Sequence, residues 1–190
     1  MAKKIVFLIV GIVVLILIGG GFFYWQENQA DVKELNKTLP EGVKVVKSLF
    51  GDEYKVVNKI DNYEFKIPSE WKGIKEIEYA PEETEQGYTA SSIGLEDKES
   101  MSRILAIDRF RIENLEDIDL ESWAKTNFEI FGLVGDFSKD KVGKYEVAKT
   151  QENVHLGGMY VYFFKQNSKI YAVTNSSEEF IRYIITNGKW

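Results

Sequence analysis

Residues 5–25 form one apolar run that contains no charged side chain. At ~1.5 Å of rise per residue, a helix of this length spans the ~30 Å hydrocarbon core of a bilayer. The run is apolar on every side, so it does not suit a helix with one face in water. We therefore predict a transmembrane helix over residues 5–25.

The flanks of this run indicate its orientation. Lys3 and Lys4 precede it, and Phe22 to Trp25 close it with aromatic rings of the kind that gather at headgroup depth. Positive charges tend to stay on the cytoplasmic side. We expect a single-pass protein of the cell membrane, with residues 1–4 as a cytoplasmic stub, residues 5–25 as a signal anchor and the C-terminal part outside the cytoplasm.

A cleaved signal peptide is the alternative interpretation of the same run. Cleavage needs small residues at positions −3 and −1, in a pattern such as Ala-x-Ala. Gly19 and Gly21 have the required spacing but lie inside the apolar run, and residues 24–30 contain no such pattern. The sequence favours an anchor that stays attached.

Composition limits the chemistry of the remaining chain. The absence of Cys excludes a disulfide scaffold, a zinc ribbon and a thiol nucleophile, and a single His excludes a metal site with two imidazoles. A net charge of −6 disfavours nonspecific binding to nucleic acid. We predict a linker or stalk over residues 26–42, with a short helical pattern at Val32, Leu35 and Leu39, and one folded domain over residues 43–190.

Strand patterns dominate the first part of this domain. Tyr63, Phe65 and Ile67 alternate with Glu64 and Lys66, which is the period of a strand with one apolar face. The other predicted strands cover residues 53–58, 74–80, 88–95, 103–111, 144–150, 159–165 and 169–174. A turn is expected at Asp61-Asn62, and a hairpin around Asn167-Ser168.

Two amphipathic helices complete the pattern. One begins after Asp119 and carries apolar residues from Leu120 to Phe131, and the other begins at Ser176 with a capping box to Glu179. The strand over residues 159–164 is apolar on both sides, which requires that both faces of its sheet be covered. We therefore predict an α/β (α+β) fold, with helices on both faces of a central antiparallel sheet.

The stretch Asn62-Tyr-Glu-Phe-Lys-Ile-Pro-Ser-Glu-Trp71 resembles the opening of bacterial domains of the Mog1/PsbP-like superfamily. The order of later elements is also similar, with a helix, a hairpin and a closing helix. This resemblance implies an α/β/α sandwich on a central antiparallel sheet. It also implies a function without catalysis, because the members of this superfamily are mostly non-enzymatic.

Few residues suggest a functional site. His155 stands alone in an expected turn, and Asp117 to Glu121 imitates a calcium loop but has Ser122 where that loop needs Gly. We expect no catalytic residue, no metal ligand and no cofactor. The candidate binding residues are the acidic patch Glu82, Glu83 and Glu85, which favours a protein partner with a basic surface.

The sequence therefore predicts a membrane-anchored, extracytoplasmic binding or assembly module for an envelope protein. Two alternatives stay open: a structural or stress-related envelope protein without a specific ligand, and a hydrolase that uses carboxylates alone. A deep groove with paired acids would favour the hydrolase.

The predicted topology is open to a direct test. Alkaline phosphatase fused after Trp190 should be active outside the cytoplasm, and alkaline carbonate should leave the full chain in the membrane pellet. Release of a soluble product that begins near residues 22–30 would identify residues 5–25 as a signal peptide instead.

Overall fold

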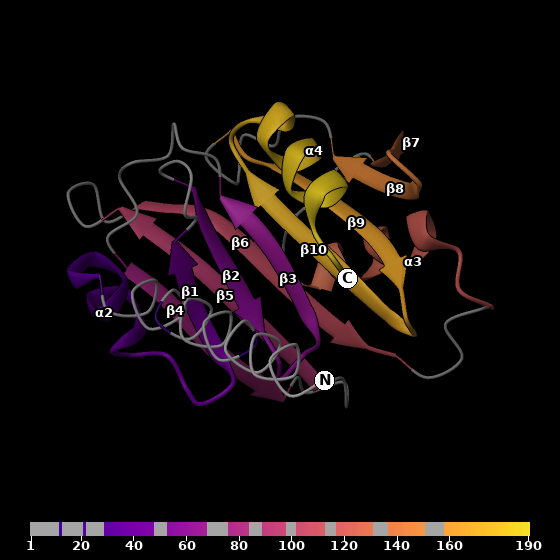
Figure 1. The fold of residues 1–190 in the computed structure, drawn as a ribbon. Helices are drawn as coiled ribbons and strands as arrows, with labels where there is room; N and C mark the ends of the chain where they lie inside the picture. Colours follow the sequence, from indigo (N-terminus) through magenta and orange to yellow (C-terminus); the bar gives the residue numbers. More distant parts are fainter. Residues whose placement is uncertain are drawn as a thin grey trace, which may run out of the picture.

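The computed structural model is an α+β fold built mostly of antiparallel sheet (Figure 1). The residues that it describes are 12, 21, 29–47, 53–67, 76–83, 89–97, 102–112, 117–130, 137–150 and 158–190. Its helices are α2 (Ala30–Asn36), α3 (Leu120–Ile130) and α4 (Glu178–Asn187). Its strands are β1 (Val43–Lys47), β2 (Tyr54–Asn58), β3 (Tyr63–Ile67), β4 (Glu76–Glu83), β5 (Thr89–Asp97), β6 (Ser102–Arg111), β7 (Phe137–Val142), β8 (Tyr145–Thr150), β9 (Tyr160–Gln166) and β10 (Lys169–Asn175).

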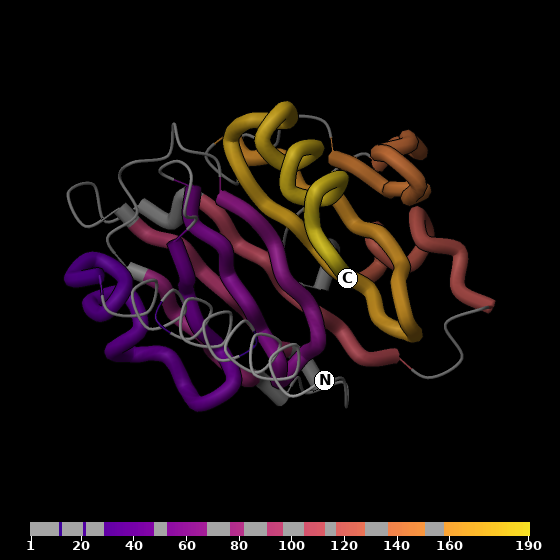
Figure 2. The backbone as a smooth tube through the Cα atoms, viewed as in Figure 1, coloured from indigo at the N-terminus to yellow at the C-terminus, as the bar shows by residue number. Residues whose placement is uncertain are grey.

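The strands form two sheets rather than one. A three-stranded sheet has the order β1-β2-β3, and a seven-stranded sheet has the order β4-β5-β6-β10-β9-β8-β7. In Figures 1 and 2 the small sheet crosses in front of β4, β5 and β6, and α4 lies beside it over β10. Helix α3 contacts the large sheet through β7, β8 and β9. We predicted strands over residues 53–58 and 63–67 as part of one central sheet. They instead belong to the small sheet, which covers the large one.

The predicted burial of both faces of the large sheet is confirmed at β9 and β10. Tyr162 and Phe164 point into a core shared with the small sheet and α4. Their neighbours Val161 and Phe163 point into a second core, which contains Trp123 of α3. Successive side chains of a strand alternate between faces, so one continuous apolar run supplies both cores.

The predicted turns are present. Asn167 and Ser168, between β9 and β10, have φ values of 52° and 57°, as a two-residue turn with both central residues left-handed requires. Asn62, with φ 61°, ends the turn between β2 and β3. Asn tolerates this conformation better than most residues, because its short amide can bond locally.

The helix starts agree with the sequence at α3 and differ by one residue at α4. Asp119 Oδ1 accepts from the Ser122 amide at 2.9 Å, which is the predicted cap. At α4, Ser177 rather than Ser176 accepts from the Phe180 amide, at 3.3 Å. The Asn175 side chain accepts from the Ser177 amide at 2.6 Å, and this bond holds Ser177 in the extended conformation that a cap needs.

The segment predicted as a stalk over residues 26–42 contains helix α2, and α2 packs on the domain. Its Val32 and Leu35 are buried, and the Asn36 side chain bonds both the amide and the carbonyl of Val45 in β1. The Asp31 carboxylate accepts from Tyr54 Oη at 2.7 Å. The apolar spacing noted in the sequence is therefore the buried face of a helix that belongs to the folded part.

The predicted spans at the N-terminus lie outside the described residues. These are residues 1–4 and 5–25, of which only Ile12 and Gly21 are described. Over the described part of the chain, no helix combines the length and the apolar character needed to cross a bilayer.

A cluster of buried polar side chains joins the two sheets. Asp61, in the turn after β2, lies with Oδ1 2.9 Å from Arg109 Nη2 of β6. Its Oδ2 accepts from Ser91 Oγ at 2.7 Å and from Asn58 Nδ2 at 2.8 Å, and Arg109 Nε donates to Ser91 Oγ at 3.0 Å. Lys169 Nζ of β10 donates to the Asp61 carbonyl at 2.6 Å. All these side chains except Lys169 are buried, so each charge depends on its partner.

Breaking this pair on one side should be costly. Asp61→Ala or Arg109→Ala should lower the free energy of unfolding by about 3–5 kcal/mol, because the remaining charge stays buried without its partner. The double variant should cost clearly less than the sum of the two. Urea unfolding of the full chain, followed by tryptophan fluorescence, measures all three.

The exposed pair Lys37–Glu34 offers the matched control, since Lys37→Ala should cost less than about 1 kcal/mol. Single variants at Asp61 and Arg109 that cost no more than this control would show that the buried pair does not hold the sheets together.

Candidate functional site

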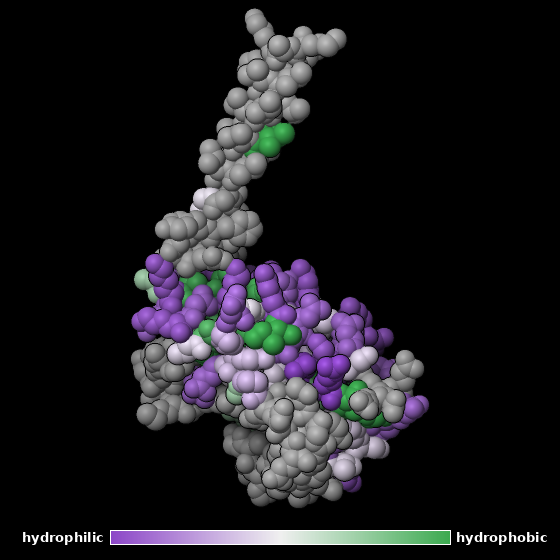
Figure 3. Space-filling model, turned by 90° about the horizontal axis from the view of Figure 1, so that it is seen from below, coloured by the Kyte–Doolittle hydropathy of each residue, from purple (hydrophilic) through white to green (hydrophobic). Residues whose placement is uncertain are grey.

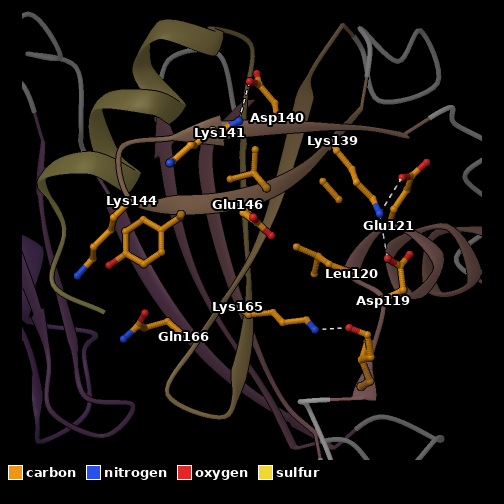
Figure 4. A pocket seen from close by; sticks show the side chains of 14 residues that line it. Asp119, Leu120, Glu121, Lys139, Asp140, Lys141, Lys144, Glu146, Lys165 and Gln166 are labelled. Atoms are coloured by element: carbon orange, nitrogen blue, oxygen red, sulfur yellow. Dashed lines mark hydrogen bonds and ion pairs between the residues drawn. The ribbon is translucent and has the colours of Figure 1, made fainter.

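An open hollow of about 870 Å³ lies where β7, β8 and the end of β9 meet the start of α3 (Figure 4). We call it the β7–β8 hollow. Its volume is within the range of roughly 300–1,000 Å³ that is typical of ligand sites. Its lining combines four lysines and four carboxylates with apolar side chains such as Leu120, Tyr145 and Val147.

Two features of the backbone open this hollow. Gly143 and Lys144 connect β7 to β8, and Gly143 has φ 58°, a conformation that Gly adopts without strain at the first position of a two-residue hairpin turn. The described pairing of β8 with β9 covers only Val147 to Lys149. The first residues of β8 and the last residues of β9 therefore border the hollow instead of continuing the ladder.

One side of the hollow is closed by ion pairs at the start of α3. Lys139 Nζ of β7 lies 3.0 Å from Asp119 Oδ2 and 3.9 Å from Glu121 Oε2. The Ser122 amide and the Lys139 ammonium lower the pKa of Asp119 to about 2. Asp119 in turn raises the pKa of Lys139. Both groups stay charged at neutral pH, and they tie α3 to β7.

Asp140 belongs to a second group of ion pairs. It binds the Arg182 guanidinium of α4, and its Oδ2 lies 3.6 Å from Lys149 Nζ, which also lies 3.3 Å from Glu178 Oε1. The Lys141 amide donates to Asp140 Oδ1 at 2.7 Å. This hydrogen bond, together with Arg182, lowers the pKa of Asp140. The carboxylate of Asp140 is therefore already occupied by protein cations.

Tyr162 supports these cations from within the sheet. Lys149 Nζ and Arg182 Cζ each lie 5.7 Å from the centre of its ring, which is within the range of cation–π attraction. Burial and the nearby Glu178 carboxylate raise the pKa of Tyr162. Its phenol therefore stays neutral, and the ring helps to hold the two cations in place.

The opposite side of the hollow carries lysines without carboxylate partners. In Figure 4, Lys141, Lys144 and Gln166 lie on one side, Lys139 with its two acids lies on the other, and Glu146 stands between. Lys144 Nζ is 5.1 Å from the centre of the Tyr145 ring. Within the described part of the chain, neither Lys141 nor Lys144 makes a salt bridge. Positive charge is thus available at Lys141 and Lys144 on this side.

The residues singled out from the sequence lie elsewhere. Glu82 and Glu83 are in β4, the opposite edge strand of the large sheet, and their side chains are not among those described. Glu85 and His155 lie outside the described residues. Asp119, which lies in the stretch that imitates a calcium loop, caps α3 as expected.

Sequence reasoning missed the lysines of the hollow. Lys139, Lys141 and Lys144 surround Gly143 in the order Lys-Asp-Lys-Val-Gly-Lys. Lysines two apart share one face of a strand, and Gly-Lys suits a hairpin turn. That spacing was the available signal, but β7 lacks the apolar alternation that would have identified it as a strand.

Neither a family model, nor a curated protein, nor a solved structure matches this chain. In the described part of the chain, no group of three or more His, Cys, Asp or Glu side chains is placed to hold a metal ion.

The Asp119 contacts predict a specific dependence of stability on pH. Asp119→Asn keeps an oxygen that can accept from Ser122 but removes the charge, so it should lower the melting temperature at pH 7 by removing the attraction to Lys139. The pKa of Asp119 falls from an ordinary 3.8 to about 2 on folding, so its charge stabilises the fold above pH 4 and loses this effect as pH falls towards 2.

Thermal unfolding of the two proteins between pH 2 and pH 7 measures this difference. The Asp119→Ala variant, which also lacks the cap acceptor, should remain less stable than the natural chain at every pH. A difference between the Asn variant and the natural chain that stays constant down to pH 2 would contradict the ion-pair assignment.

Proposed function

We propose that this chain is a single-pass membrane protein whose extracytoplasmic domain is a non-catalytic binding or assembly module for an envelope protein. The observation that carries this proposal is the β7–β8 hollow, an open site whose lining combines charged and apolar side chains. Protein interfaces commonly join an apolar centre to a polar rim. The uncharged run over residues 5–25 supports the membrane anchor.

Two carboxylates of the hollow, Asp119 and Asp140, support binding rather than hydrolysis. An acid catalyst of glycoside cleavage needs a carboxyl group whose pKa is raised, so that it keeps its proton. In the hollow, the Ser122 amide and Lys139 lower the pKa of Asp119, and the Lys141 amide and Arg182 lower that of Asp140. These two groups are suited to permanent charge rather than to proton transfer.

The layering of the domain supports the resemblance to the Mog1/PsbP-like superfamily. Helix α3 lies on one face of the large sheet, and α4 lies on the other beside the small sheet. An α/β/α sandwich on an antiparallel sheet is the fold that this resemblance implies. We therefore assign the chain to this fold as part of the proposal, with β1, β2 and β3 as an addition to one helical layer.

The surface supports contacts based on charge. Among the residues coloured in Figure 3, hydrophilic ones predominate, and the hydrophobic ones lie in separate patches. Among the described residues, the large hydrophobic side chains that are exposed are Ile12 and Ile60. With a net charge of −6, the chain should attract a partner that has a basic surface, chiefly by raising the association rate.

The partner contact should therefore depend on salt. Cross-linking in native membranes, with the full chain as bait, identifies the partner. Its association should weaken as salt rises to physiological strength, because exposed charges are screened beyond ~8–10 Å. Reversal of Glu82, Glu83 and Glu85 to Lys should weaken it more than reversal of three separate acidic residues, Glu41, Asp117 and Glu179.

The three control residues are exposed acids outside β4, and the change in net charge is the same. A partner whose binding ignores salt and both sets of reversals would contradict the electrostatic contact. Failure to capture any partner from native membranes would contradict the proposed function itself.

A further inference from the structure

The charges that line the β7–β8 hollow do not cancel evenly. Asp119 and Glu121 are engaged by Lys139, and Asp140 is engaged by Arg182 from α4. The lysine side of the hollow therefore keeps its charge, although the chain as a whole is acidic. Positive charge at Lys141 and Lys144 attracts a carboxylate, which the rest of this acidic chain repels.

We propose that this hollow binds an extended acidic segment of the partner protein, with Lys141 and Lys144 as the groups that recognise its carboxylates. This inference rests on the proposed function and names the chemistry of one contact. Such a partner presents a basic surface to the acidic edge at β4 and an acidic segment to the hollow at β7. The two contacts lie at opposite edges of the large sheet.

Local structure holds the two lysines ready. They flank the tight turn at Gly143, so they project from one hairpin end. Lys144 lies over the Tyr145 ring, and Tyr145 is itself buried against Phe164, with ring centres 5.1 Å apart. A side chain restrained in this way loses less conformational freedom when it binds a carboxylate.

The rest of the lining favours a protein segment over a dense polyanion such as polyphosphate. Leu120, which is only partly buried, supplies an apolar contact, for which a chain of phosphates has no counterpart. Glu146 stands between the lysine side and the paired side, where it repels negative charge (Figure 4). A peptide meets both conditions because it can place an apolar residue beside Glu146 and carboxylates beside the lysines.

Salt should weaken the repulsion between an acidic ligand and the distant acidic residues of this chain. At physiological salt, the distant acidic residues of the chain are screened over ~8 Å, whereas lysines in direct contact with a carboxylate are screened much less. Binding of an acidic peptide should therefore persist at about 0.15 M salt, which is the physiological ionic strength.

The test uses the full chain in nanodiscs of uncharged lipid. The probe is a fluorescent eight-residue peptide, Glu-Ala-Glu-Leu repeated twice, and its counterpart has Gln in place of every Glu. Fluorescence anisotropy should show binding of the acidic peptide only. The double variant Lys141→Gln/Lys144→Gln should weaken it at least tenfold, and Glu146→Gln should tighten it several-fold, because the repulsion within the hollow is removed.

The matched control is Lys33→Gln/Lys125→Gln, which removes the same charge from exposed lysines of α2 and α3. It should change the affinity less than twofold. If both double variants weakened peptide binding equally, the loss of affinity would come from the net charge of the protein, and the proposal would be overturned. Lack of peptide binding would overturn it too, as would tighter binding of polyphosphate with the same dependence on Lys141 and Lys144.

The two proposals fail separately. If a partner cross-linked in native membranes keeps its affinity for the Lys141→Gln/Lys144→Gln chain, the hollow is not its acidic contact, although the binding function stands. If no partner is found but the acidic peptide binds the hollow as described, the site stands and its role in envelope assembly is wrong.

Discussion

The burial of both faces of β9 and β10 is the constraint on which the other elements depend. Because Tyr162 and Phe164 point one way and Val161 and Phe163 the other, each face of the large sheet must be covered. Helix α3 covers one face. On the other, the small sheet and α4 form a layer that the C-terminus completes.

Trp190 shows how closely that layer is fitted. Its ring centre lies 5.1 Å from those of Phe164 and Tyr171 and 5.4 Å from that of Tyr63, so the last residue of the chain joins β3 to β9 and β10. Its Nε1 donates to the Ile185 carbonyl at 3.1 Å, which satisfies the polar atom of a buried indole. The preceding Lys189 pairs with Glu64 across the edge of β3. Trp190 thus closes one side of the core.

The edges of the large sheet are also protected by side chains. Thr38 Oγ1 donates to the Ile77 carbonyl of β4 at 3.3 Å, and Arg182 Nη1 donates to the Lys141 carbonyl of β7 at 3.3 Å. Occupied carbonyls on an edge strand discourage pairing with the strand of another molecule. Each edge strand of the large sheet thus has a carbonyl that a side chain already occupies.

Much of this fold could be predicted because its strands and helices carry apolar periodicity. The alternation at Tyr63–Ile67 and the double-sided run in β9 defined strands, and the stripes of α3 and α4 defined helices. Strand β7 was missed because its sequence, FSKDKV, buries only Val142 fully. The hollow could not be predicted, since it depends on where the pairing of β8 with β9 ends, and no local pattern records that.

The position of α2 adds a geometric consequence to the predicted anchor. If residues 5–25 cross the bilayer, α2 begins within five residues of the span, a distance of at most about 18 Å even for an extended chain. Helix α2 contacts β1 and β4, so it ties the β4 edge of the large sheet to the membrane end of the domain. The β7–β8 hollow lies at the other edge, six strand spacings or about 29 Å away. If α2 holds the β4 edge at the membrane end, the hollow and its lysines lie on the side of the large sheet that is farther from the span.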